Sequence, residues 1–176
     1  MKQLDHNLSE RVHRLELGAV DYFLVLPGML FGSYVMPLTV TAMALWLGWQ
    51  LGAVAVIVAI TTLAITNPMK QWFGRLRPQP LLVKRAFKLR KLVNNPSFPS
   101  GDSAQAGAMV TLVIMFAPWP WSLFALPLIP LCMFSRVYYG AHWFGDTIAG
   151  VAIGCFVALP FGYWFADFVR SGLPAA

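Results

Sequence analysis

Long stretches without a charged residue constrain this chain more than any other feature. No acidic, basic or histidine residue occurs in residues 22–69, 103–135 or 147–166. A helix needs about 20 apolar residues to cross a bilayer, with about 17 as a lower limit. The first stretch therefore accommodates two transmembrane helices, the second two short ones and the third one. We expect an all-α, polytopic membrane bundle of five transmembrane helices, folded as a single domain over residues 1–176.

The composition excludes a soluble fold. Hydrophobic residues make up 58% of the chain and charged residues 11%, whereas soluble domains average about 25% charged residues. A helix on the surface of a soluble protein has one polar face, and residues 51–66 and 109–117 have almost none. The pI of about 9.7 does not indicate nucleic-acid binding, because the chain has no soluble domain to present a basic face.

Turns and prolines divide the apolar stretches into spans. We expect transmembrane helices over residues 30–47, 51–68, 102–117, 121–137 and 142–168. Residues 20–29 are also apolar, and Pro27 and Gly28 would separate them from the next helix. A sixth span starting near Leu15 is therefore the alternative, although it would bury Asp21 at a cost.

The first 19 residues are polar, with apolar side chains at helical spacing at positions 4, 8, 12 and 15. This pattern predicts an amphipathic helix that lies on the membrane surface, and a frayed tail is the alternative. The N-terminus also lacks the apolar core and cleavage site that are typical of a removable signal peptide.

Three polar clusters lie at the ends of the expected spans, at residues 70–78, 99–102 and 135–146. With five spans, all three fall on the same side of the membrane, so their side chains can form one pocket. The first cluster opens a loop over residues 70–101, which holds more than half of the 13 basic residues and no acidic one.

His142 and Asp146 are four residues apart and therefore share one face of a helix. A carboxylate in this position can accept the proton of one imidazole nitrogen and leave the other nitrogen as a nucleophile. The alternative is a buried polar pair that only ties helices together, as polar groups often do in membranes.

Basic side chains surround this pair. Lys70, Arg77 and Arg136 would converge on a pocket at the membrane interface, and arginine forks suit phosphate oxygens. Ser100 and Gly101 open the next helix, whose first N–H groups attract anions. Ordinary snorkelling at span ends is the alternative. It suits the remaining basic residues of the loop, which we assign to the membrane surface: Lys84, Arg85, Lys88, Arg90 and Lys91.

The order and spacing of these motifs resemble the type 2 phosphatidic acid phosphatase (PAP2) superfamily, in its membrane lipid-phosphatase branch. The matching pieces are Lys70…Arg77-Pro78, Pro99-Ser100-Gly101 and Ser135-Arg136…His142…Asp146. The resemblance implies a two-step phosphoryl transfer without metal or other cofactor, in which His142 attacks phosphorus and water hydrolyses the phosphohistidine. It also implies that Asp146 orients His142. The implied phosphate ligands are Lys70, Arg77, Ser100, Gly101 and Arg136.

The second motif departs from the family pattern, because it normally ends in a histidine and here ends in Asp102. That histidine is the family's general acid, whereas an aspartate is mostly ionised at neutral pH. Three readings are open. In the first, Asp102 is held protonated and serves as the acid. In the second, the substrate is a lipid diphosphate, whose phosphate leaving group needs no acid. In the third, the protein binds phospholipid without turnover. The second has the firmest chemical basis.

The small size of the chain, with almost no domain outside the membrane, leaves little surface for a large sugar headgroup. This disfavours lipid A and favours a polyprenyl diphosphate, followed by phosphatidic acid or phosphatidylglycerol phosphate. The competing hypothesis is a protein that binds or translocates phospholipid without turnover. The basic loop predicts a site on the cytoplasmic side of a bacterial inner membrane or a eukaryotic endomembrane. The sequence leaves the oligomeric state open.

Overall fold

The computed structural model describes residues 2–78 and 96–173, whose regular elements are all α-helices. The helices are α1 Lys2–His13, α2 Val20–Leu30, α3 Met36–Leu47, α4 Trp49–Phe73, α5 Gly101–Phe116, α6 Trp121–Ala125, α7 Leu128–Tyr138, α8 Phe144–Trp164 and α9 Ala166–Arg170. Among these residues, three segments are long and apolar enough to cross a membrane. They are α4, α8 and residues 121–138, which combine α6 and α7. The helices α2, α3 and α5 are apolar but shorter.

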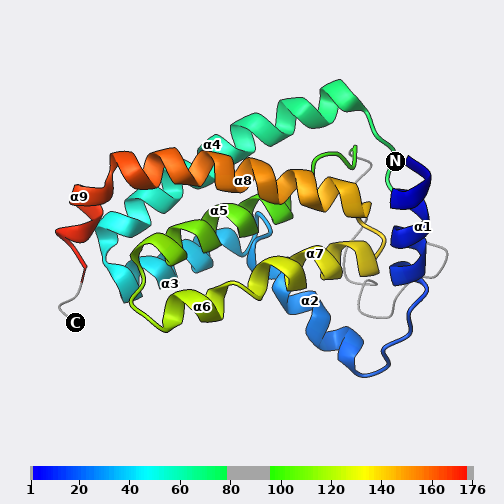
Figure 1. Cartoon of the computed structure of the whole chain (residues 1–176), viewed down its shortest axis with the longest axis horizontal. Coiled ribbons are helices and arrows are strands. Elements are labelled where there is room, and N and C mark those ends of the chain that lie inside the picture. The colour runs from blue at the N-terminus through cyan, green and yellow to red at the C-terminus, as the bar shows by residue number, and fades with distance from the viewer. Residues whose placement is uncertain (1, 79–95, 174–176) are drawn as a thin grey trace.

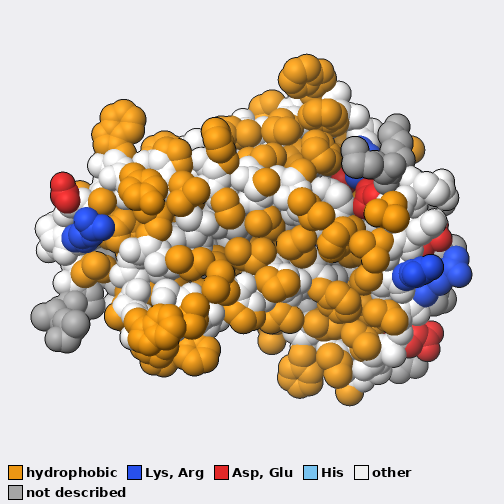
Figure 2. Space-filling model, viewed as in Figure 1, with side chains coloured by type: hydrophobic (Ala, Val, Ile, Leu, Met, Phe, Trp, Pro, Cys, Tyr) orange, Lys and Arg blue, Asp and Glu red, His pale blue; other side chains and the backbone are white. Residues whose placement is uncertain are grey.

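The helices run back and forth along the long axis of the molecule. Helices α2 and α3 follow each other in one direction, α4 runs back, α5 returns, α6 and α7 run back, and α8 returns (Figure 1). Helix α1 lies across the end where α5 and α8 begin, and α9 lies at the opposite end (Figure 1). On the face shown in Figure 2, the charged side chains gather at the two ends, with a mostly hydrophobic band between them. The all-helical class is confirmed. The path of the chain along the bundle is compatible with five crossings of a membrane, and the number of spans stays a prediction.

The first expected span, residues 30–47, is wrong as one continuous helix. Helix α2 ends at Leu30, residues 31–35 form turns and a bend, and α3 begins only at Met36. Helix α2 has 11 residues and α3 has 12, so neither is long enough to cross a bilayer alone. The first passage along the bundle is therefore built from two consecutive half-length helices.

The end of α2 before this interruption is in contact with α7. Arg136 donates a hydrogen bond through Nη2 to the backbone carbonyl of Gly28, close to the end of α2. A side chain at Gly28 would collide with Ser135, because its Cβ would lie 2.4 Å from the serine Oγ. The expected break at Pro27 does not occur, since α2 runs through this proline. The chain bends instead after Leu30.

The remaining boundaries agree with the expected spans to different degrees. Helix α5 begins and ends within one residue of the expected span 102–117. Helix α4 runs on to Phe73, so the first residues of the expected loop 70–101 are helical. The expected last span, 142–168, is divided after Trp164 into α8 and α9. The basic loop residues assigned to the membrane surface, at positions 84–91, lie outside the described residues.

Helices α5 and α8 form the closest contact in the bundle. A Cβ at Gly154 would lie 1.9 Å from the Ala104 carbonyl oxygen, and one at Gly150 would lie 2.4 Å from the Ser100 carbonyl oxygen. Small residues at four-residue spacing allow two helix backbones to approach in this way. This contact holds the first turns of α5 and α8 together at the end of the bundle where α1 lies.

Helix α1 is confirmed as a helix but is shorter than the expected 1–19. Its apolar positions face outward, since Leu4 is 75% exposed. Its buried side chains are polar, with Ser9 only 3% and His13 only 5% exposed. Helix α1 therefore packs on the bundle through a polar ridge and leaves its leucines on the outside.

Candidate active site

The structure gathers the predicted site residues at the end of the bundle that α1 covers. Lys70 lies near the end of α4, Gly101 and Asp102 open α5, and Arg136 lies near the end of α7. His142 lies in the turn before α8, and Asp146 lies in the first turn of α8. Lys70 is within electrostatic range of Arg77, Asp102, Arg136 and Asp146.

The imidazole of His142 has a defined orientation. Its Nδ1 lies 2.7 Å from the backbone carbonyl oxygen of Ser97. A carbonyl oxygen only accepts hydrogen bonds, so Nδ1 carries the proton and Nε2 keeps its lone pair. The side chain is almost completely buried, and this burial lowers the pKa of His142 below its usual value. The neutral tautomer has a nucleophilic nitrogen at Nε2.

Asp146 lies beside His142 but makes its shortest contacts elsewhere. Its Oδ2 lies 3.8 Å from Nδ1 of His142 and accepts a hydrogen bond from the backbone N–H of Trp143 at 3.0 Å. Its Oδ1 accepts a hydrogen bond from Arg75 at 2.6 Å. The closest acceptor for the imidazole proton is thus the Ser97 carbonyl, and the expected orienting role of Asp146 stays a prediction.

Arg77 lies next to the candidate nucleophile. Its Nη1 donates a hydrogen bond to the Ala141 carbonyl oxygen at 2.8 Å and lies 3.4 Å from Nε2 of His142. A phosphate group close enough for attack by Nε2 would therefore also lie next to the Arg77 guanidinium.

Arg136 and Asp102 form an ion pair. Arg136 Nη2 lies 2.8 Å from Asp102 Oδ2, and the arginine is 6% exposed at its side chain. The same nitrogen also donates to the Gly28 carbonyl. Arg136, an expected phosphate ligand, is therefore paired with Asp102, the residue at the position of the family's general acid.

The start of α5 combines structural and ligand-binding features. Ser100 caps the helix, because its Oγ accepts a hydrogen bond from the Ser103 N–H at 3.3 Å, and its side chain is buried. A Cβ at Gly101 would lie 3.6 Å from Nζ of Lys70. The ammonium of Lys70 thus lies over the positive end of α5, where N–H groups favour an anion.

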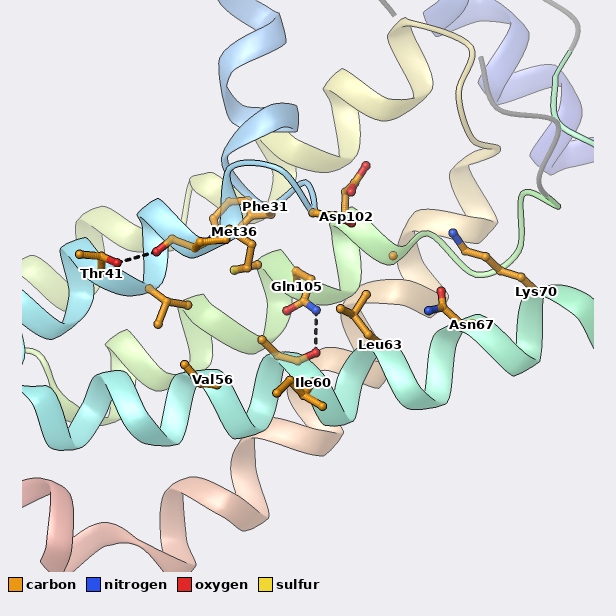
Figure 3. A pocket seen from close by; sticks show the side chains of 15 residues that line it. Phe31, Met36, Thr41, Val56, Ile60, Leu63, Asn67, Lys70, Asp102 and Gln105 are labelled. Carbon is orange, nitrogen blue, oxygen red and sulfur yellow. Dashed lines mark hydrogen bonds between the residues drawn. The ribbon is translucent and has the colours of Figure 1, made fainter. Parts of the chain in front are cut away.

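Two cavities flank the start of α5. One, of about 450 Å³, is lined by apolar residues of α3 and α4 and by Lys70, Gly101 and Asp102. Figure 3 shows Lys70 and Asp102 at one end of this cavity and apolar side chains such as Val56 and Ile60 toward the other. The second cavity, of about 1240 Å³, lies against α1 and contains His142, Arg77 and Arg75 in its wall. Of the predicted residues, Lys70, Gly101 and Asp102 line the first cavity, and Arg77 and His142 line the second.

Sequence reasoning missed two contributors to the site. Arg75 belongs to the first polar cluster, but nothing in its spacing distinguished it from the neighbouring basic residues. Ser97 contributes through its backbone carbonyl, which leaves no side-chain pattern to find.

The comparisons with known proteins agree with these motifs. A family model described as the PAP2 superfamily matches residues 46–170. An undecaprenyl-diphosphatase of Sulfolobus acidocaldarius is 31% identical over 62% of this chain and 52% of the relative. A lipid A 1-phosphatase of Rhizobium johnstonii is 32% identical over 75% of this chain and 53% of the relative. The chain thus spans about half the length of these curated relatives.

Two solved structures share the fold. The LpxE structure from Aquifex aeolicus has a TM-score of 0.76 at 20% identity, covering 90% of this chain and 94% of that one. A transmembrane PAP2-type phosphatidylglycerolphosphate phosphatase from Bacillus subtilis has a TM-score of 0.74 at 21% identity, covering 94% of this chain and 86% of that one. With its long apolar helices and its family match over most of the chain, this integral membrane protein belongs to the PAP2 superfamily.

Proposed function

We propose that this protein is a membrane phosphatase that removes phosphate from a lipid phosphate or diphosphate. The observation that carries this proposal is the hydrogen bond from His142 Nδ1 to the Ser97 carbonyl at 2.7 Å. It leaves Nε2 unprotonated and 3.4 Å from the Arg77 guanidinium. A pure phosphate-binding site has no need of a nucleophilic nitrogen held in this way.

The reaction proceeds in two displacements. His142 Nε2 forms a bond to phosphorus while the P–O bond to the lipid breaks, and the electron pair leaves with the lipid oxygen. Water then attacks phosphorus, the P–N bond breaks and inorganic phosphate is released. Arg77, Lys70 and the N-terminus of α5 stabilise the charge on the transferring group. The described residues contain no group of three acidic, histidine or cysteine side chains arranged for a metal, and the chemistry we propose uses none.

The ion pair of Asp102 with Arg136 supports a diphosphate substrate. The Asp102 carboxylate lies 2.8 Å from the Arg136 guanidinium, so in this arrangement it accepts a hydrogen bond and is not aimed as a donor. A lipid alkoxide is a poor leaving group without a donor, whereas a phosphate monoester leaves readily because its last pKa is about 6. The name of the Sulfolobus relative, undecaprenyl-diphosphatase, supports the same substrate class.

The smaller cavity offers space for the lipid tail. Most of its wall is apolar, with Met36 and Val40 from α3 and Val56, Ile60 and Leu63 from α4, and it reaches Lys70 and Asp102 (Figure 3). The polar residues Ser33, Thr41, Asn67 and Gln105 also line it. This gradient from apolar to charged matches a lipid with a phosphate at one end. The basic residues of the loop 70–101 support a cytoplasmic site by the positive-inside tendency.

The test is phosphate release by the purified full-length protein in detergent with EDTA and no added metal. The substrates are a polyprenyl diphosphate, phosphatidic acid, phosphatidylglycerol phosphate and lipid A, since two kinds of relative bear the names of different lipids. We expect release to be fastest from the diphosphate and to be lost in His142→Ala. Release that survives this substitution would refute the mechanism.

A second candidate is a protein that binds phospholipid without turnover. It is favoured by one observation, since the expected phosphate ligand Arg136 is already occupied by Asp102. Saturable binding of the same lipids, without release from any of them, would establish this candidate instead.

A further inference from the structure

Helix α1 contacts the catalytic end through three polar side chains at four-residue spacing. Asp5 Oδ1 accepts a hydrogen bond from the Gly145 N–H at 2.7 Å. Ser9 Oγ accepts one from the Phe144 N–H at 2.9 Å. His13 Nδ1 lies 2.9 Å from the Tyr138 carbonyl oxygen. Asp5 and Ser9 therefore satisfy the first N–H groups of α8, the helix that carries Asp146, from the far end of the sequence.

Asp5 also begins a chain of charges that leads to the nucleophile. Arg75 Nη2 lies 2.6 Å from Asp5 Oδ2, and Arg75 Nη1 lies 2.6 Å from Asp146 Oδ1. Asp146 is fully buried, while Asp5 and Arg75 are only 18% and 26% exposed at their side chains. The next step along the chain is His142, whose Nδ1 is 3.8 Å from Asp146 Oδ2.

Each member of this chain depends on the previous one. A buried carboxylate without a counter-ion is costly, and Arg75 supplies the counter-ion of Asp146. A guanidinium has several donors in one plane, so a second carboxylate on Nη2 fixes the orientation of Nη1. Asp5 provides that second carboxylate and is itself held by the Gly145 N–H.

Position 145 is suited to this contact. A Cβ there would lie 3.1 Å from Asp5 Oδ2, which is closer than most side chains tolerate. The absence of a side chain at Gly145 thus allows the Asp5 carboxylate to lie directly on the start of α8.

We propose that α1 is part of the active site and that Asp5 is a positioning residue, which acts through Arg75 on Asp146 and His142. This inference rests on the proposed function. It also gives Arg75 a different role from Arg77: Arg75 is the link between two carboxylates, whereas Arg77 lies at the nucleophile.

The test compares Asp5→Asn with Glu10→Gln in the full chain. Glu10 lies on the same helix, undergoes the same change of charge and is 48% exposed at its side chain, where it pairs with Arg14 at 3.6 Å. We expect Asp5→Asn to lower kcat for lipid phosphate on the order of 10-fold with KM unchanged, because a small misplacement of reacting groups costs rate rather than binding. Glu10→Gln should leave both kcat and KM unchanged. Asp5→Glu should recover part of the loss.

A double substitution separates the proposed chain from independent effects. If Asp5 acts through Arg75, adding Asp5→Asn to Arg75→Gln should cause no further loss of kcat. Losses that multiply, a wild-type kcat in Asp5→Asn, or a raised KM with unchanged kcat would each overturn the proposal.

An activity-independent readout keeps this proposal distinct from the proposed function. The ¹⁵N resonances of the His142 ring, assigned with His142→Ala, should change in Asp5→Asn and not in Glu10→Gln. If the wild-type protein releases no phosphate but its His142 resonances respond to Asp5, the proposed function fails and the positioning role stands. Unchanged resonances would overturn the positioning role whatever the activity.

Discussion

The Nδ1 atom of His142 donates its hydrogen bond to the backbone carbonyl of Ser97, 2.7 Å away. Ser97 is itself tied to the segment that carries the arginines, since its N–H donates to the Arg75 carbonyl at 2.7 Å and its hydroxyl donates to the Leu76 carbonyl at 3.2 Å. The same short strip of chain therefore determines which imidazole nitrogen is protonated and where the guanidinium groups lie. The proposed nucleophile His142 and the proposed phosphate ligand Arg77 are thus positioned by the same segment.

The first prediction concerns pH. Burial lowers the pKa of His142, so its imidazole stays neutral at pH values where an exposed histidine, with a pKa of about 6.5, is half protonated. Attack by Nε2 requires the neutral ring. We therefore expect the rate of phosphohistidine formation to be maintained as the pH falls from 7.5 to 6.5, and to decline only below that range.

Single-turnover measurements at pH 7.5, 6.5 and 5.5 would check this, with the ionisation of the substrate followed separately by ³¹P NMR. A rate already halved at pH 6.5, at constant substrate ionisation, would contradict the prediction.

The second prediction concerns the leaving group. Asp102→His places a proton donor at the start of α5, and Asp102→Asn breaks the ion pair with Arg136 without adding one. We expect Asp102→His to raise kcat for phosphatidic acid more than for a polyprenyl diphosphate, because only the alkoxide leaving group needs the proton. Asp102→Asn should show no such preference. Equal effects of Asp102→His on both substrates, measured as phosphate release, would refute the argument.

The third prediction concerns Arg77. Its guanidinium lies 3.4 Å from Nε2 of His142, where negative charge would develop on the transferring phosphoryl group in the mechanism we propose. Removing one donor to such charge costs about 10²–10³ in kcat, so Arg77→Ala should lose about that factor in phosphate release. The exposed Arg14 is the matched control, and Arg14→Ala should retain the wild-type rate. A loss of less than 10-fold in Arg77→Ala would assign this arginine a minor role.

Side-chain patterns predicted some features of this site well and others not at all. The four-residue spacing of His142 and Asp146 correctly indicated that the two lie close together, with Nδ1 and Oδ2 3.8 Å apart. The expected shared helix face is wrong, because His142 lies in a bend before α8 begins at Phe144. The limits of α5 followed from the Pro99-Ser100-Gly101 turn before it and from the apolar run behind it. The capping of this helix by Ser100 was not predicted.

Features that depend on contacts between distant segments were not predictable. The break after Leu30 lies close to the hydrogen bond from Arg136 to the Gly28 carbonyl of α2. No pattern within residues 30–47 indicates that contact. The role of the Ser97 carbonyl could not be predicted either, because every residue has a backbone carbonyl. The sequence predicted a surface helix over residues 1–19, and nothing in its pattern indicated that Asp5 and Ser9 of α1 would accept hydrogen bonds from the start of α8.

The last prediction tests the packing that brings the catalytic helices together. Gly154 of α8 has no room for a side chain, since a Cβ would lie 1.9 Å from the Ala104 carbonyl oxygen and 2.7 Å from the Ala108 nitrogen of α5. These are backbone atoms and cannot rotate away, so Gly154→Leu must separate the two helices. Overpacking of this kind costs about 1–3 kcal/mol or more, and we expect a lower thermal unfolding temperature in detergent. Ala152→Leu adds the same side chain on the exposed face of α8 and should leave that temperature unchanged.

The Gly154→Leu substitution should also affect activity. Ser100 and Asp146 lie at the starts of α5 and α8 and are joined by a 3.0 Å hydrogen bond from the Ser100 N–H to the Asp146 carbonyl. Gly154→Leu should therefore also reduce phosphate release at temperatures where the protein is still folded. Lower stability with a wild-type rate would show that the site tolerates separation of α5 and α8.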